Sequence, residues 1–252
     1  MPDLPKPIPA ATLILMRPRA GGAPEILMME RSQAMAFAAG ALVFPGGRID
    51  PDDHAAAARF APDLEDAPAR IAAIRETLEE TGIAAGLSPA PDAGAAGAFR
   101  SAVAAGAPFS RLLAEHGLRP QLDALTPFAR WCPNFRETRR FDTLFYLAEA
   151  PDDVAPATAD NDEAVRAFWA TAAQVLAEID SGRAHAIFPT RRNLERLARF
   201  ATFEEARADA ALHPVRKITP WVEERAGSRF VCIPEGTGYP ITAEPLETAR
   251  RR

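Results

Sequence analysis

The sequence predicts an α/β fold in which a mixed sheet has helices on both sides. Apolar, β-compatible segments occur in two pairs, first at 11–16 and 26–29 and then at 128–132 and 143–148. A helical segment at about 67–81 separates the two pairs, and further helical patterns follow the last strand. This order of strands and helices is typical of a mixed sheet between two helical layers.

Turn signals delimit the first elements. Residues 11–30 predict a hairpin, because Ala20-Gly21-Gly22-Ala23-Pro24 separates its two apolar segments. A short apolar run at 41–44 is stopped by Pro45-Gly46-Gly47. Asp50-Pro51 then indicates a helix start, with Asp as the cap residue and Pro at the first helical position.

Two segments have the composition of insertions. Residues 54–66 are Ala-rich and then polar. Residues 84–97 are rich in Ala, Gly and Pro and predict a loop, while 99–116 predicts a second helix. We therefore expect insertions at about 54–66 and at about 84–125.

The C-terminal part contains one more strand and two more helices, predicted at 164–169, 171–179 and 189–201. We expect residues 9–201 to form one domain. Residues 202–252 are interpreted as a C-terminal extension packed on the same domain, with two β-rich pieces within 215–241.

The composition excludes several classes of protein. The chain has 252 residues, 48% of them hydrophobic, and a formal net charge of −5 without a long basic run, so nucleic acid is not an expected partner. No window approaches 18 uninterrupted apolar residues, which argues against a membrane span. Cys132 and Cys232 alone make no disulfide framework, and the N-terminus lacks a signal peptide, so a cytoplasmic location is expected.

The helix at 67–81 contains the most informative pattern. It begins at Asp66-Ala67-Pro68 and ends at Gly82. Its apolar side chains recur at helical spacing and define a buried face: Ile71, Ile74 and Leu78. At 100° per residue, three glutamates fall within an arc of about 100° on roughly the opposite side: Glu76, Glu79 and Glu80.

Three clustered carboxylates are locally unfavourable. Like charges at i, i+4 cost roughly 0.2–0.5 kcal/mol per pair, and the last turn of a helix disfavours anions by roughly 0.3–1 kcal/mol. Arg75 can relieve Glu79, its i+4 partner, but not all three. Taken alone, the pattern is most often a solvated, salt-bridged surface. A hard cation such as Mg²⁺ or Mn²⁺ would remove both penalties.

The surrounding motif favours the metal site. Gly46-Gly47, Asp53 and the run Arg75-Glu76-Thr77-Leu78-Glu79-Glu80-Thr81-Gly82-Ile83 resemble the Nudix box, G-x5-E-x7-R-E-U-x-E-E-x-G-U with U apolar. The second half of the box is matched at every fixed position, except that Thr77 stands at a U position and is not strictly apolar. In its first half Asp53 stands where the box has Glu, and the spacer at 54–74 has 21 residues instead of seven. This departure places an insertion before the helix and puts the role of Asp53 in doubt.

The resemblance implies a fold and a set of site residues. The fold would be a Nudix-type α/β/α sandwich with helical insertions and a C-terminal extension. Glu76, Glu79 and Glu80 would bind Mg²⁺ or Mn²⁺, with the backbone at Gly47 near the ion. Glu79, Arg75 and Glu76 are the expected catalytic residues. Glu163 is a further candidate carboxylate, whereas Asp50 is more simply a helix cap.

Within the superfamily, the chain resembles the coenzyme A and acyl-coenzyme A diphosphatases that have a long insertion in the box. The similarity extends over most of 9–200 and includes the segments 27–32, 43–50, 131–143 and 187–190. The signature of that branch has a second Arg where this chain has Ala36.

The branch suggests how the substrate is bound. Phosphates would be contacted by arginines, namely Arg31, Arg139 and Arg140. Trp131 or Phe37 is a candidate for stacking on adenine, with core packing as the alternative.

The expected activity is hydrolysis of a pyrophosphate bond in a nucleoside diphosphate linked to another group. Coenzyme A or an acyl-coenzyme A is the preferred substrate, which would give 3′,5′-ADP and a phosphopantetheine product. The alternatives are ADP-ribose or another nucleotide sugar, a hydrolase of loose specificity, and a Nudix-fold module that binds a nucleotide without cutting it. Because Nudix proteins often dimerise, the resemblance also allows a homodimer.

Overall fold

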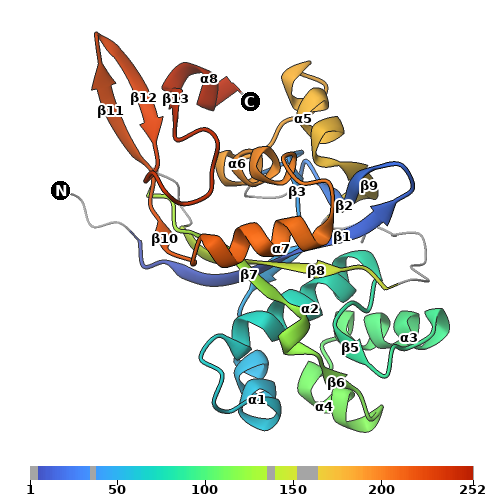
Figure 1. Ribbon diagram of the computed structural model, residues 1–252. Helices are drawn as coiled ribbons and strands as arrows, with labels where there is room; N and C mark the ends of the chain where they lie inside the picture. The colour runs from blue at the N-terminus through green and yellow to red at the C-terminus, as the bar shows by residue number, and fades with distance from the viewer. Residues whose placement is uncertain (1–4, 35–37, 135–139, 152–163, 252) are drawn as a thin grey trace.

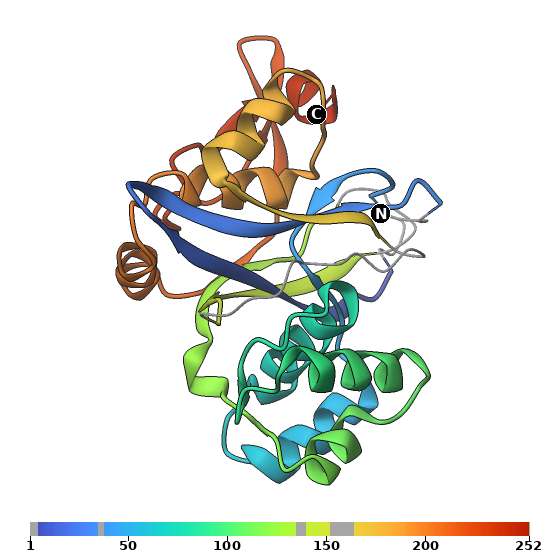
Figure 2. The ribbon, with the colours of Figure 1, turned by 90° about the vertical axis from the view of Figure 1, so that its right-hand side faces the viewer.

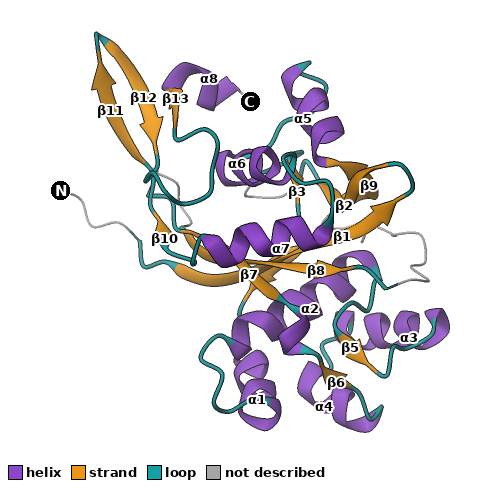
Figure 3. Ribbon diagram, in the orientation of Figure 1, coloured by secondary structure: helices purple, strands orange, loops and turns teal. Residues whose placement is uncertain are grey.

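A mixed eight-stranded sheet forms the centre of the computed structural model, which describes residues 5–34, 38–134, 140–151 and 164–251 (Figures 1 and 3). Its strand order is β10-β7-β8-β1-β2-β3, with β4 paired to β1 and β9 paired to β2. The strands are β1 (Ile8–Arg19), β2 (Gly22–Arg31), β3 (Leu42–Val43), β4 (Gly46–Arg48), β7 (Thr126–Trp131), β8 (Phe141–Glu149), β9 (Ala164–Thr171) and β10 (Lys217–Ile218).

The sheet contains both parallel and antiparallel strand pairs, as the prediction of a mixed sheet requires. Strands β1 and β8 run parallel over nine residue pairs, from Ile8↔Phe141 to Met16↔Glu149. Strands β1 and β2 form the antiparallel hairpin predicted at 11–30. Strand β4 pairs with the other end of β1 through Thr12↔Gly46, so Gly46 and Gly47 lie in a strand of the sheet and not in a turn.

Helices cover both faces of the sheet (Figure 2). One face is covered by α1 (Pro51–Phe60), α2 (Ala67–Thr81), α3 (Ala93–Ala104) and α4 (Phe109–Glu115). The short strand β5 (Leu87–Ser88) lies between α2 and α3 in the chain and pairs with β6 (Arg119–Pro120), which follows α4; a 3₁₀ turn, η1 (Leu122–Ala124), then leads to β7. This side of the core contains Leu13, Leu15 and Leu27 from the sheet, which alternate with residues that face the opposite side.

The second face is covered by α5 (Ala172–Asp180), α6 (Phe188–Leu197) and α7 (Phe203–Leu212). A three-stranded sheet of β11 (Trp221–Arg225), β12 (Ser228–Cys232) and β13 (Ala243–Pro245) follows, and α8 (Leu246–Arg251) comes last. Figure 1 shows the hairpin β11–β12 projecting from the body of the molecule. Residues of the C-terminal part, including Ala206, Ile218 and Tyr239, belong to the same apolar cluster as the sheet residues Ile14 and Met28.

Several expectations about individual elements are wrong. The predicted loop at 84–97 contains β5 and the start of α3. The single helix predicted at 99–116 is two helices, because Gly106, with a φ of 85°, and Pro108 interrupt it. By contrast, α1 begins where Asp50-Pro51 predicted a helix start, and it extends through residues 54–60. The C-terminal part contains a helix, α7, in addition to β-rich pieces.

Candidate active site around the glutamates of helix α2

Helix α2 is enclosed by other elements instead of lying on the surface. Ile71, Ile74 and Leu78 are fully buried against the sheet, as their spacing predicted. The opposite side is also covered, since Glu80 is 4% exposed. The three glutamates therefore do not form a fully solvated surface, although the side chain of Glu79 is 26% exposed and forms an ion pair with Arg75. The helix ends where predicted, at Gly82, whose φ of 74° is the left-handed conformation that glycine adopts most readily.

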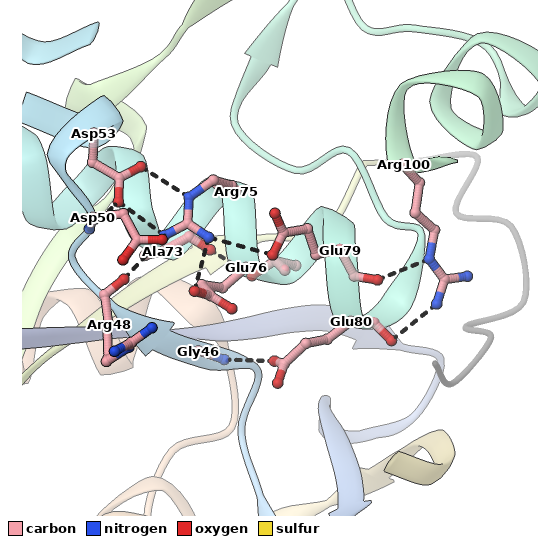
Figure 4. A network of polar contacts seen from close by, with 11 residues as sticks. Gly46, Arg48, Asp50, Asp53, Ala73, Arg75, Glu76, Glu79, Glu80 and Arg100 are labelled. Carbon is pink, nitrogen blue, oxygen red and sulfur yellow. Dashed lines mark hydrogen bonds and ion pairs between the residues drawn. The ribbon is translucent and has the colours of Figure 1, made fainter. Parts of the chain in front are cut away.

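Arg75 lies at the centre of the polar network on α2 (Figure 4). Its Nη1 donates hydrogen bonds to Glu76 Oε1 at 2.8 Å and to Glu79 Oε2 at 3.3 Å. Its Nη2 donates to the carbonyl oxygen of Arg48 at 3.0 Å. One guanidinium thus fixes two of the three glutamates and ties α2 to β4.

The same guanidinium binds Asp53 on α1. Arg75 Nε donates to Asp53 Oδ1 at 2.9 Å and Nη2 donates to Oδ2 at 2.8 Å, while Asp53 is completely buried. The Asp53 carboxylate also accepts a hydrogen bond from the backbone N–H of Asp50, the N-cap residue of α1. Asp53 therefore holds Arg75 in place despite the 21-residue spacer.

Two further contacts connect the glutamates of α2 to Gly46 and Gly47, the first residues of β4. Glu80 Oε2 accepts a hydrogen bond of 2.8 Å from the backbone N–H of Gly46. Glu76 lies against Gly47, where an added Cβ would come within 2.4 Å of the glutamate's carboxyl carbon. Only glycine permits this close approach of backbone and carboxylate.

The C-terminus of α2 is held by a residue outside the box. Arg100 on α3 donates from Nε to the carbonyl oxygen of Glu79 at 2.8 Å and from Nη2 to that of Glu80 at 3.3 Å (Figure 4). Arg100 is not among the site residues predicted from the sequence.

Burial raises the pKa of two of the three glutamates, Glu76 and Glu79. Burial raises the pKa of Glu76, and although Arg75 opposes this, the charge of Glu79 adds to it, which brings the pKa to about 7. Burial also raises the pKa of Glu79. Burial alone would lower the pKa of Arg75, but its hydrogen bond to Asp53 and the charges of Glu76, Asp53 and Glu79 raise it. Arg75 therefore stays a cation.

The donor set at this position fits a hard divalent cation. Among residues 5–34, 38–134, 140–151 and 164–251, no three His, Cys, Asp or Glu side chains form a ready-made metal site. Glu76, Glu79 and Glu80 instead accept hydrogen bonds from Arg75 and Gly46. All three present oxygen donors, and Glu76 lies against the backbone of Gly47. Carboxylate and carbonyl oxygens are the ligands that Mg²⁺ prefers.

Of the predicted substrate-binding arginines, the structure describes Arg31 and Arg140. Arg31 ends β2, and its buried Nε has no hydrogen-bond partner among the described residues. Arg140 Nε donates to the carbonyl oxygen of Pro133 at 3.2 Å. Arg139, Phe37 and Glu163 lie outside the described residues.

Trp131 and the two cysteines are buried in the core. Trp131 is buried, and its Nε1 donates to Tyr239 Oη at 2.8 Å on the face of the sheet opposite α2, so the core-packing alternative describes it. Cys132 and Cys232 are both buried and free. No helix in the described part of the chain is sufficiently long and apolar to cross a membrane.

The chain has close structural similarity to a solved enzyme. The crystal structure of a NUDIX hydrolase from Alicyclobacillus acidocaldarius superposes with a TM-score of 0.71 and 28% sequence identity, covering 81% of this chain and 96% of that one. A MutT protein from Methanosarcina mazei Go1 superposes at a TM-score of 0.42 with 18% identity, covering 78% of this chain and 97% of its own. With its α/β fold and the complete glutamate run on α2, the chain belongs to the Nudix hydrolase superfamily and is a Nudix pyrophosphohydrolase.

A curated relative lies in the branch that the sequence resembles. It is the acyl-coenzyme A diphosphatase NUDT19 of Gallus gallus, which is 26% identical to this chain over 86% of this chain and 73% of its own length. No protein-family model matches the chain.

Proposed function

We propose that this enzyme hydrolyses the pyrophosphate bond of coenzyme A or an acyl-coenzyme A, with Mg²⁺ or Mn²⁺ at the glutamates of α2. The observation that carries the proposal is the pairing of Glu76 with Gly47 and of Glu80 with Gly46, which places one partly buried and one buried glutamate against the same backbone segment at the start of β4. The similarity to an acyl-coenzyme A diphosphatase supports the choice of substrate.

Glu76, Glu79 and Glu80 would hold the metal, together with the backbone at Gly47. When bound, the ion neutralises charge on the phosphate oxygens and lowers the pKa of water. Of the two glutamates that Arg75 contacts, Glu79 is the more accessible, with its side chain 26% exposed against 14% for Glu76. We assign Glu79 to accept the proton of the attacking water, and Arg75 to orient Glu76 and Glu79.

The reaction balances without any further reactant. The oxygen of water forms a bond to one phosphorus of the pyrophosphate, and the bond from that phosphorus to the bridging oxygen breaks. The bridging oxygen leaves with the electron pair on the other phosphate, and Glu79 takes up the proton. Coenzyme A would give 3′,5′-ADP and phosphopantetheine, and Arg31, Arg139 and Arg140 are proposed to contact the substrate's phosphates.

A panel of pyrophosphates tests the assignment. Coenzyme A, an acyl-coenzyme A, ADP-ribose and a nucleotide sugar are incubated with Mg²⁺ or Mn²⁺, and products are identified by mass spectrometry. The proposal predicts that the two coenzyme A substrates give 3′,5′-ADP with the highest kcat/KM. Cleavage of ADP-ribose with coenzyme A untouched would contradict the branch assignment.

The panel also tests the non-catalytic alternative. A protein that binds these nucleotides but cuts none of them would be a binding module. The Glu80→Gln variant is the matched control for the enzyme, because glutamine keeps an oxygen that can accept the hydrogen bond from Gly46 N–H. The proposal predicts that this variant folds normally and loses turnover.

A further inference from the structure

We propose that Arg100 is a positioning residue for the active site, through which helix α3 fixes the C-terminal turn of α2. The proposal rests on the proposed function in one respect only, namely that Glu79 and Glu80 bind the metal. Its structural part, that Arg100 immobilises this turn, does not depend on any ligand.

The last turn of α2 needs external partners for its carbonyl groups. A helix leaves its final four C=O groups without intrahelical donors. Gly82 N–H bonds to the carbonyl of Leu78, whereas the carbonyls of Glu79 and Glu80 receive hydrogen bonds from Arg100. These bonds are charge-assisted, which makes them stronger than bonds between neutral groups. The two residues that Arg100 holds by their backbone are therefore two of the three glutamates.

Arg100 also supplies positive charge where the helix needs it. The C-terminus of a helix has partial negative charge, and two glutamates in the same turn add to it. Basic residues are absent from the last turn of α2 itself. The guanidinium of Arg100 at this end thus offsets part of the penalty that the sequence pattern predicted.

Glu79 and Glu80 are therefore each held through both the backbone and the side chain. The backbone of Glu80 is fixed by Arg100 and its carboxylate by Gly46 N–H. The backbone of Glu79 is fixed by Arg100 and its carboxylate by Arg75. Small movements of this helical turn would therefore shift the Glu80 carboxylate relative to Gly46 and the Glu79 carboxylate relative to Arg75.

The helix that presents Arg100 is itself anchored. Ala96, Phe99 and Val103 are buried on one side of α3 in the same cluster as the core of α2. At the other end of α2, Arg70 Nη1 donates to the carbonyl oxygens of Leu122 and Leu125, which follow α4. The segment between α2 and β7 thus braces the glutamate helix at both of its ends.

The test compares Arg100→Ala with Arg111→Ala in the full chain. Arg111 is a matched control because it lies on the neighbouring helix α4 and makes an exposed ion pair with Glu115. Amide hydrogen exchange of the metal-free proteins is followed in peptides that cover residues 76–84. We expect exchange in this segment to be roughly tenfold faster in Arg100→Ala and unchanged in Arg111→Ala.

Three further measurements separate a positioning role of Arg100 from a general structural one. Arg100→Lys keeps the charge but has one donor group in place of a planar fork, so its exchange should fall between wild type and Arg100→Ala. Mn²⁺ affinity, measured by calorimetry, should be roughly tenfold weaker in Arg100→Ala. For coenzyme A, kcat should fall while KM changes little.

Unchanged exchange at 76–84 in both Arg100 variants would overturn the proposal, as would wild-type Mn²⁺ affinity in Arg100→Ala. If Arg100→Ala does not fold, Arg100→Lys decides by the same two measurements. A wild-type protein that binds no Mn²⁺ would contradict the proposed function, while the exchange rates would still decide whether Arg100 fixes the turn.

Discussion

Asp53 and Arg75 are joined by two hydrogen bonds, of 2.9 and 2.8 Å, across 22 positions of the sequence, and both side chains are buried. The pair links α1 to α2. Because the same guanidinium also contacts Glu76 and Glu79, the position of two glutamates depends on an aspartate outside their helix.

Asp53→Asn should destabilise the protein by about 3 kcal/mol, because it leaves the buried cation Arg75 without its main counter-charge. Urea unfolding measures the change. Asp63→Asn is the control, since Asp63 is exposed between α1 and α2. Equal stability of the two variants would show that the buried pair does not hold α2 in place.

Gly47→Ala should lower metal affinity and activity by roughly tenfold to a hundredfold, since its Cβ would lie 2.4 Å from the carboxyl carbon of Glu76 and must displace that carboxylate. Mn²⁺ titration and turnover measure the effect. Gly97→Ala on α3 is the matched control, because nothing lies within 4 Å of its added Cβ. That control should keep full activity and gain up to about 1 kcal/mol of stability. Normal Mn²⁺ binding by Gly47→Ala would contradict the placement of Glu76.

Mg²⁺ affinity should weaken as the pH falls through about 7. The pKa of Glu76 is raised by burial to about 7, so the carboxyl is protonated below that pH and a metal must displace the proton. Calorimetry in buffers of different ionisation enthalpy should detect proton release on binding. Affinity that stays constant between pH 6 and 8 would contradict a role for Glu76 as ligand.

The same shift has a consequence for stability without metal. The folded-state pKa of Glu76 lies above the unfolded value, so its protonated form is favoured by folding. The metal-free protein should therefore lose stability as the pH rises from about 4.5 to about 7, and Mg²⁺ should restore it above that range. Thermal unfolding with EDTA and with Mg²⁺ across this interval checks the sign.

Glu79→Gln should lower kcat by roughly 10²–10⁴ if Glu79 accepts the proton from water. The change removes the proton acceptor but keeps an oxygen that can bind Arg75 Nη1. Glu115→Gln on α4 is the control, since Glu115 is an exposed partner of Arg111. Turnover by Glu79→Gln above half of the wild-type rate would exclude this role.

The sequence predicted α2 accurately because local signals define it. The spacing of Ile71, Ile74 and Leu78 gave the buried face, and Gly82 gave the end, as the structure confirms. The contact of Arg75 with Glu79 followed from i, i+4 spacing and is also present.

Contacts between residues far apart in the sequence were harder to predict. The 21-residue spacer hid the approach of Asp53 to Arg75, since the box spacing alone put that carboxylate in doubt. Arg100 lies in an Ala- and Gly-rich stretch whose side chains give little periodicity, and its partners are backbone carbonyls, which no sequence motif marks.

Two of the wrong predictions about helices could have been avoided, because the sequence contains a signal for each. Gly106 and Pro108 separate α3 from α4, and both residue types are common helix terminators. Thr202 caps the N-terminus of α7: its hydroxyl accepts a hydrogen bond from Glu205 N–H, while the Glu205 carboxylate accepts one from the backbone N–H of Ala201. A Thr followed three residues later by Glu is a known helix-start pattern, and it predicts this helix.

The most direct test of the site is a titration of Mn²⁺ into the purified protein and its Glu80→Gln variant, followed by electron paramagnetic resonance of the free ion. The site described above predicts saturable binding by the wild type and binding at least tenfold weaker in the variant, whose fold should stay intact because its side-chain oxygen can still meet Gly46 N–H. Equal binding by both proteins, or none by the wild type, would contradict it.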